Sequence, residues 1–281
     1  MMTRSMIAAA ALACSALIVT PERPAQAAGV VLAPHRAVYD LSLLRARGKR
    51  PVASVRGRIL YDFSGNACDG YALNFRQVSE LDSGEGKTSL SDLRANTWEE
   101  GAAKRFRFNS QNFVNQRAVD SVDGAAVRDA EHVTVKLAKP ADKSFDLETT
   151  MVFPTEHMRR IIEAARDGKT LLELPVYDGS ETGERIYSTL TVIGREIALD
   201  EKQPTDAAAN QAALAGLKRW PVTISYFDRT EKKGGEQTPV YAISFELYEN
   251  GISRALALDY GDFVVAGEMS QLEIKDPAAC K

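Results

Sequence analysis

The sequence lacks the short motifs that mark the common enzyme classes. It contains no H-E-x-x-H zinc motif, no G-x-S-x-G nucleophile elbow, no P-loop and no G-x-G-x-x-G dinucleotide fingerprint. The three histidines, His35, His132 and His157, are not spaced as metal ligands, and His157 is expected to face solvent. Glu99 and Glu100 are interpreted as ordinary strand-end charges. We therefore expect no catalytic residue, no metal site and no cofactor, with an uncharacterised hydrolase as the alternative.

Cysteine is scarce, with one residue each at positions 14, 68 and 280. Cys14 falls in an N-terminal segment that we expect to be removed, which leaves Cys68 and Cys280 as one possible pair. The absence of a C-x-x-C motif argues against a redox role. We expect a Cys68–Cys280 disulfide, worth up to roughly 5 kcal/mol in the chain-entropy model. Two free or intermolecular thiols are the alternative.

Long apolar runs are absent after the N-terminus. The run Met6–Val19 has the length of a signal-peptide core and is short for a membrane span. Ala25-Gln26-Ala27 supplies the small-x-small pattern of a cleavage site. We expect a Sec signal peptide over residues 1–27, cleaved after Ala27, and a mature protein in the periplasm, where disulfides persist. Lipid attachment at Cys14 is the weaker alternative, because the apolar run continues past that residue.

The sequence also has no excess of positive charge. It carries 35 Lys and Arg against 38 Asp and Glu, a formal net charge of −3. This balance argues against a nucleic-acid partner. One local exception is the stretch "LRARGKRP", which places Arg45, Arg47, Lys49 and Arg50 in one hairpin connection. These residues could contact an anionic lipid surface; the alternative is a solvated turn.

The dominant positive signal is period-two alternation of apolar and polar residues. It is seen in "VRGRILYDF" at 55–63, "GYALNFRQV" at 70–78 and "VYAISFELYENG" at 240–251. We predict roughly 12–14 strands of one large antiparallel sheet with a wet face, in a single domain over residues 28–281. Dipeptides that accept positive φ are expected to separate the strands. They are Asp69-Gly70, Asp123-Gly124, Asp178-Gly179 and Asn250-Gly251.

Two short helices are expected to interrupt the strands. In "PTEHMRRIIEAARDGK" at 154–169, Thr155 is the predicted N-cap and Gly168 closes the C-terminus. Its apolar stripe must lie on the sheet or fill the open side of the sheet, because so short a helix is unstable alone. The second predicted helix is the Ala-rich segment 205–220, with Thr205 or Asp206 as its cap.

Aromatic residues occur on the apolar side of many predicted strands. They are Tyr39, Tyr61, Tyr71, Phe75, Phe106, Phe108, Tyr226 and Phe245. A strongly curved sheet lined in this way could hold an acyl chain or a lipoprotein segment. The alternative is that these rings fill the core.

Several stretches together carry a family resemblance. They are "LAPHRAVYDLSL" at 32–43, "GRILYDFSGNACDGYALNFR" at 57–76, the "ELYENG" hairpin at 246–251 and the C-terminal cysteine. In them the chain resembles the EipB (envelope integrity protein B) family of periplasmic domains of unknown function, over essentially its whole mature length. The resemblance implies one domain whose roughly fourteen strands curl into a spiral, or open barrel-like, sheet. That shape is similar to the lipoprotein carriers LolA and LolB, and the family disulfide is carried over to Cys68 and Cys280.

The resemblance also implies a role in cell-envelope integrity and resistance to envelope stress, with no catalytic residue to transfer. The leading hypothesis is a monomeric, non-enzymatic periplasmic factor that binds a protein or lipoprotein partner. The second hypothesis is a carrier that holds a lipid or acyl chain in the concave side of the sheet. The third is the uncharacterised hydrolase.

Overall fold

Alternating residues form strands along almost the whole chain. The computed structural model describes residues 29–47, 52–84, 86–198, 204–229, 237–277 and 279–280. Its strands are β1 His35–Ala46, β2 Ser54–Asn66, β3 Gly70–Asp82, β4 Thr88–Glu99, β5 Arg105–Val114, β6 Arg117–Arg128, β7 Val133–Lys139, β8 Lys143–Leu147, β9 Leu171–Val176, β10 Tyr187–Ile193, β11 Arg219–Asp228, β12 Tyr241–Tyr248, β13 Ser253–Asp259 and β14 Phe263–Ile274. The α-helix is α1 Pro154–Arg166, and η1 Ala207–Ala209 is a 3-10 turn. The predicted mainly β architecture with few helices is confirmed.

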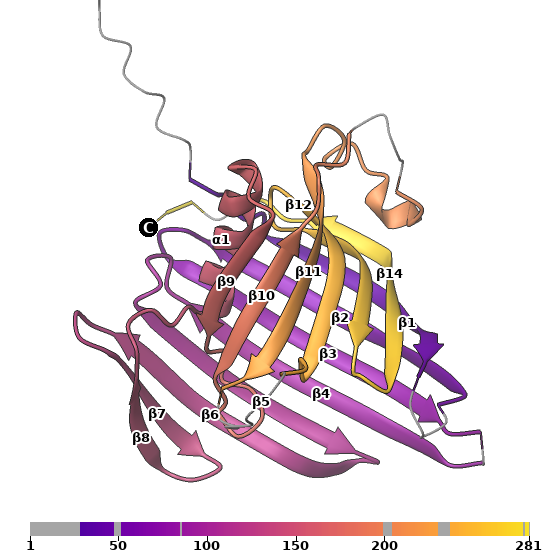
Figure 1. Cartoon of the computed structure of the whole chain (residues 1–281), viewed down its shortest axis with the longest axis horizontal. Coiled ribbons are helices and arrows are strands. Elements are labelled where there is room, and N and C mark those ends of the chain that lie inside the picture. The colour runs from indigo at the N-terminus through magenta and orange to yellow at the C-terminus, as the bar shows by residue number, and fades with distance from the viewer. Residues whose placement is uncertain are drawn as a thin grey trace, which may run out of the picture.

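All these strands belong to one 14-stranded antiparallel sheet. Its order is β8-β7-β6-β5-β4-β3-β2-β1-β14-β13-β12-β11-β10-β9, so β1 and β14 join two consecutive meanders. The sheet bends until β9–β12 lie in front of β2–β4 (Figure 1). Its end strands, β8 and β9, do not pair, so the barrel stays open. Only Val152, which follows β8, forms an isolated parallel bridge with Val176 at the end of β9.

Three of the four predicted turn dipeptides connect elements as expected. Gly70, Gly179 and Gly251 have φ values of +95°, +67° and +88°, which favour glycine. Asp123-Gly124 was wrongly predicted as a turn, because both residues lie inside β6 at a bulge. Glycine is required there by packing: a Cβ on Gly124 would lie 2.6 Å from the Phe108 ring.

Helix α1 covers part of the concave face of the sheet (Figure 1). Gly168, at φ +71°, ends it as predicted, and the N–H of Lys169 donates to the Ala164 carbonyl at 2.9 Å. Two other predictions about this helix were wrong. Thr155 does not cap it, because Pro154 already occupies the first turn and Phe153 is the N-cap residue, without a side-chain cap bond. His157 is buried rather than facing solvent.

The predicted second helix over 205–220 does not form. Only η1 and hydrogen-bonded turns occupy this segment. Asp206 is buried, where its carboxylate accepts the backbone N–H of Met269 at 3.1 Å and pairs with the buried guanidinium of Arg254. Asp206 is therefore bound to Arg254 of β13 and Met269 of β14, and its carboxylate does not cap a helix.

The buried apolar side chains form two separate clusters. The first, here called the aromatic core, is built on β5–β8 with Phe106, Phe108, Phe153 and Tyr177. Adjacent ring centroids in it are 5.1–5.7 Å apart. The second, here called the cavity core, is formed by side chains from β1–β3, α1 and β10–β14. No helix among the described residues is long and apolar enough to cross a membrane.

Candidate functional site

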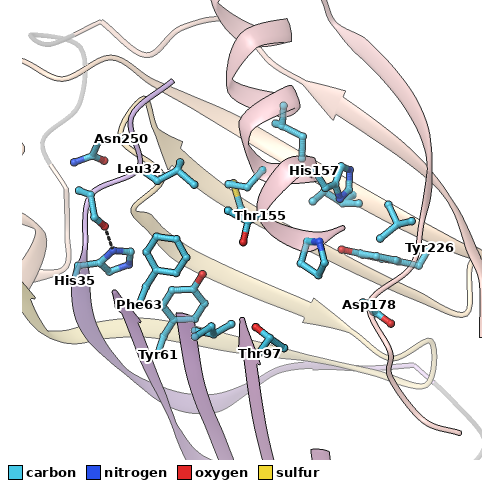
Figure 2. Close-up of a pocket in the computed structure, with 18 residues that line it drawn as sticks. Leu32, His35, Tyr61, Phe63, Thr97, Thr155, His157, Asp178, Tyr226 and Asn250 are labelled. Atoms are coloured by element: carbon cyan, nitrogen blue, oxygen red, sulfur yellow. Dashed lines mark hydrogen bonds between the residues drawn. The ribbon is translucent and has the colours of Figure 1, made fainter. Parts of the chain in front are cut away.

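Two adjoining cavities lie between α1 and the concave face of the sheet. The first has a volume of about 230 Å³ and the second about 200 Å³. Both are lined by His35, Tyr61, Met158 and Gly251, so they meet at these four residues. Together they fall near the lower end of the roughly 300–1,000 Å³ range of small-molecule sites. Figure 2 shows the first cavity, with residues of β2, α1 and β11 converging on it.

Aromatic rings from two sides of the bent sheet make the walls. On one side His35 stacks on Tyr61, with ring centroids 5.4 Å apart, and Phe63 continues the row. On the other side Tyr226 and Tyr241 line the cavities, with ring centroids 5.9 Å apart. The second cavity is lined by the aliphatic residues Ile59, Ile243, Leu256 and Leu258 and by further aromatic rings such as Phe245. Apolar side chains therefore line both cavities on either side of the residues that they share.

Helix α1 is fixed at the first cavity by an acid from a distant strand. The Glu99 carboxylate, at the end of β4, accepts the backbone N–H groups of Thr155 at 2.7 Å and Glu156 at 2.8 Å. These are the N–H groups that an N-cap side chain normally satisfies. Glu156 also pairs with Arg128 of β6 at 3.0 Å. Glu99 is therefore the residue that sets the position of the helix wall, and it is not an ordinary strand-end charge.

The two histidines of the first cavity are neutral at pH 7. Burial lowers the pKa of His157 to about 4, helped by the nearby Arg160 cation. Burial also lowers the pKa of His35, whose Nδ1 lies 2.7 Å from the Ala33 carbonyl oxygen. His157 Nε2 lies 3.4 Å from the Thr189 hydroxyl. Both rings thus act as polar wall groups.

Of the described residues that line the two cavities, Asp178 is the single acidic one. Its Oδ1 accepts the backbone N–H of Ser180 at 2.9 Å. Burial raises its pKa, and the nearby Glu181 carboxylate raises it further. Burial likewise raises the pKa of Tyr61 to about 12 and the pKa of Tyr226. The described part of the cavity lining therefore contains hydrogen-bonding groups, but no lysine, arginine or cysteine.

The aromatic residues singled out in the sequence divide between the two cores. Five of them line the cavities: Tyr39, Tyr61, Phe75, Tyr226 and Phe245. Tyr71 stacks on Phe63 in the cavity core, and Phe106 and Phe108 belong to the aromatic core. Both interpretations of the rings, cavity lining and core filling, thus hold in different parts of the molecule.

The two distant cysteines are joined. Cys68 and Cys280 form a disulfide across a sequence separation of 212, as the sequence predicted. Cys68 lies in the turn between β2 and β3, so the bond ties the C-terminal tail to that turn. The ammonium of Lys275 on the same tail pairs with Asp62 of β2. The disulfide lies outside both cavity linings.

The basic residues named as a surface contact do not join this site. Arg45 and Arg47 are exposed at the end of β1, and Arg47 pairs with Asp259 at 2.9 Å. Lys49 and Arg50 lie outside the described residues. Contact between this stretch and an anionic surface stays a prediction.

Sequence reasoning missed the residues that give the site its polarity. His35 and His157 come together with Asp178 in the first cavity, although they were dismissed singly, and Asp178 was interpreted only as part of a turn. Glu99 had a usable signal: it is in phase with Leu93, Ala95 and Thr97, so a charge falls on the inward side of β4. Within the described residues no group of three potential metal ligands exists.

A single open antiparallel sheet bent around an apolar double cavity places the chain among β-barrel-like proteins. In structure it is similar to the crystal structure of a beta-barrel-like protein of a domain of unknown function from Brucella abortus. The TM-score is 0.80 at 38% identity, and the match covers 88% of this chain and 100% of that one.

The chain belongs to the EipB-like family, whose model matches residues 26–276. It is similar to the cell envelope integrity protein EipB of Brucella abortus (strain 2308), with 39% identity over 250 residues. That match covers 89% of this chain and 87% of the relative. The family resemblance inferred from the quoted stretches is thereby confirmed.

Proposed function

We propose that this protein maintains cell-envelope integrity without catalysis, by holding the aliphatic chain of a lipid or lipoprotein partner in the double cavity. The name of the Brucella relative supports the envelope role. The proposal includes export to the periplasm with removal of residues 1–27, a setting in which the Cys68–Cys280 disulfide is stable. It also includes a monomer that meets its partner at the cavity.

One observation carries the proposal, namely that two largely apolar cavities adjoin and share four lining residues. Their combined lining is aromatic and aliphatic, and the chain of Met158 lies where they meet. Burying an aliphatic chain there is favourable by about 0.8 kcal/mol for each methylene removed from water. The neutral histidines support a binding role over acid–base chemistry, because burial lowers the pKa of His157 to about 4, far below the range useful for a base at pH 7.

The test fills the second cavity with a larger side chain. Ile243 lines the second cavity, and Ala242 precedes it on the opposite face of β12. Ile243→Trp should fill the cavity, whereas Ala242→Trp adds the same ring to the other face. Each variant is expressed in cells that lack the native gene and are challenged with detergent and cell-wall antibiotics.

We expect Ala242→Trp to restore resistance and Ile243→Trp to fail at equal protein levels. Native mass spectrometry of the proteins released from the periplasm should show bound lipid on the native chain and on Ala242→Trp alone. Full resistance with Ile243→Trp, together with ligand-free native protein, would refute the proposal.

A further inference from the structure

We infer that the first cavity selects amphiphiles with an ammonium group, which it binds beside Asp178 while the aliphatic chain extends into the second cavity. The inference rests on the proposed function, because it names the head group that accompanies the chain. It depends on the distribution of charge in the lining, which differs between the two cavities.

The charge in the lining has one sign. Among the described lining residues Asp178 is the single acid, and none of them is a lysine or arginine. No described lysine or arginine forms an ion pair with Asp178; its Oδ1 accepts the backbone N–H of Ser180. Arg185, the cation of the same loop, pairs with Glu181 at 3.0 Å and with Asp228. A partly buried carboxylate without a countercharge is unfavourable, and a bound cation would reduce that cost.

Glu181 and the rings of Tyr187 and Tyr226 lie near Asp178. Glu181 lies close enough to disfavour ionisation of Asp178. Tyr187 donates its hydroxyl to Glu181 Oε1 at 3.1 Å, and its ring meets the Tyr226 ring edge-to-face. Aromatic faces attract ammonium groups, and the attraction is stronger when water is excluded. Figure 2 shows Tyr226 and Asp178 at the end of the cavity away from His35.

The same lining disfavours anionic head groups. His35 and His157 are neutral because burial lowers the pKa of each, so neither supplies a positive charge at pH 7. A carboxylate or phosphate drawn into the first cavity would meet Asp178 and no cation. Fatty acids and phosphate-bearing heads are therefore expected to bind poorly, unless the head stays outside.

The lining of the second cavity suits the aliphatic chain of such an amphiphile. Its lining includes Ile243, Phe245, Leu256 and Leu258, and its described residues include no carboxylic acid, lysine or arginine and only the shared His35 as a histidine. A chain that starts at Asp178 passes Tyr61 and Met158 before it reaches these residues. Head and chain are thus assigned to different cavities by charge and by polarity.

The test compares three probes with the same chain on the full native protein. They are dodecyltrimethylammonium, dodecanol and dodecanoate, titrated calorimetrically at pH 7.5 below their aggregation concentrations. We expect the cation to bind roughly tenfold more tightly than the alcohol, and the anion to bind more weakly than the alcohol. Asp178→Asn should remove the advantage of the cation and keep the affinity for dodecanol, because Asn can still accept the Ser180 N–H.

Glu184→Gln is the matched control, because it also removes one acid from this loop. Glu184 pairs with Lys143 and does not line the cavity. It should keep the preference of the native protein. Dodecanol binding without a cation preference, or a preference that survives Asp178→Asn, would overturn the inference and leave the proposed function intact. Absence of binding by all three probes would overturn both. If Asp178→Asn fails to fold, the ranking of the probes on the native protein still decides.

Discussion

The aromatic core and the cavity core are both built from strands that alternate apolar and polar residues. Side chains fill the interior of the first, whereas the second surrounds a cavity. In the aromatic core the rings of Phe106, Phe108 and Phe153 are in contact, with centroids 5.1–5.3 Å apart. In the cavity core the rings of Tyr61 and Tyr226 line a space of about 230 Å³. Aromatic residues on the inward face of a strand therefore do not predict whether the interior is filled or contains a cavity.

This difference in packing depends on which groups lie against the aromatic rings. In the aromatic core two glycines lie against Phe108, since a Cβ would come within 2.6 Å of its ring on Gly124 and within 2.4 Å on Gly179. Backbone therefore fills the space that side chains would otherwise need. In the cavity core α1 covers the rings, and Glu99 fixes the start of the helix. A helix held at its N-terminus covers the concave face without filling it.

The largest expected effect tests whether the two cores differ in packing. Phe106→Ala should lower the free energy of unfolding by about 3–5 kcal/mol, because a fully enclosed ring leaves a cavity behind. Met158→Ala is the matched change, and it should cost about 1 kcal/mol because this half-buried side chain already borders empty space. Urea unfolding of both variants measures the difference. Equal costs would contradict the distinction between the cores.

The next effect concerns the disulfide, which ties the cavity side of the molecule. Cys68→Ser should lower the free energy of unfolding by roughly 2–4 kcal/mol under oxidising conditions. Hydrogen exchange should accelerate in β1 and β2, next to the released tail, and change little in β5–β8. Reduced native protein serves as the control and should match the variant. Identical melting of the two oxidised proteins would argue against any stabilising role for the bond.

The smallest effect is the acid sensitivity of the cavity core. The unfolded state binds a proton on His157 near pH 6.5, whereas the folded state does so only near pH 4. The contribution of His157 to the free energy of unfolding should therefore fall by up to roughly 3 kcal/mol between these values, and no further below them. His157→Gln should remove this part of the pH dependence, as measured by urea unfolding at pH 7 and pH 4.5.

His132→Gln, at the exposed start of β7, is the control and should leave the slope unchanged. Burial raises the pKa of Glu99 to about 7, so Glu99 contributes a stabilisation that grows as the pH falls from 7. Because Glu99 is present in every protein compared, its contribution cancels in the difference between the native chain and the variant. A slope unaffected by His157→Gln would show that this ring does not confer the sensitivity.

Much of the architecture follows from the sequence because its signals are local. Alternation over a few residues specifies strands such as β2 and β3, and one apolar stripe with Gly168 specifies α1. The disulfide follows from counting, since Cys68 and Cys280 are the only cysteines after Cys14. Each of these features depends on neighbouring residues or on composition, and it can therefore be predicted from a single sequence.

The features that only the tertiary structure decided all join residues far apart in the chain. Pairing of β1 with β14 joins the two meanders into one sheet, and the bend of that sheet brings His35, Asp178 and Tyr226 to one cavity. The Asp206–Arg254 ion pair likewise prevents a helix that local propensity favours. Such contacts are chosen by burial and charge pairing after the strands associate, and nothing in the residues next to each partner encodes them.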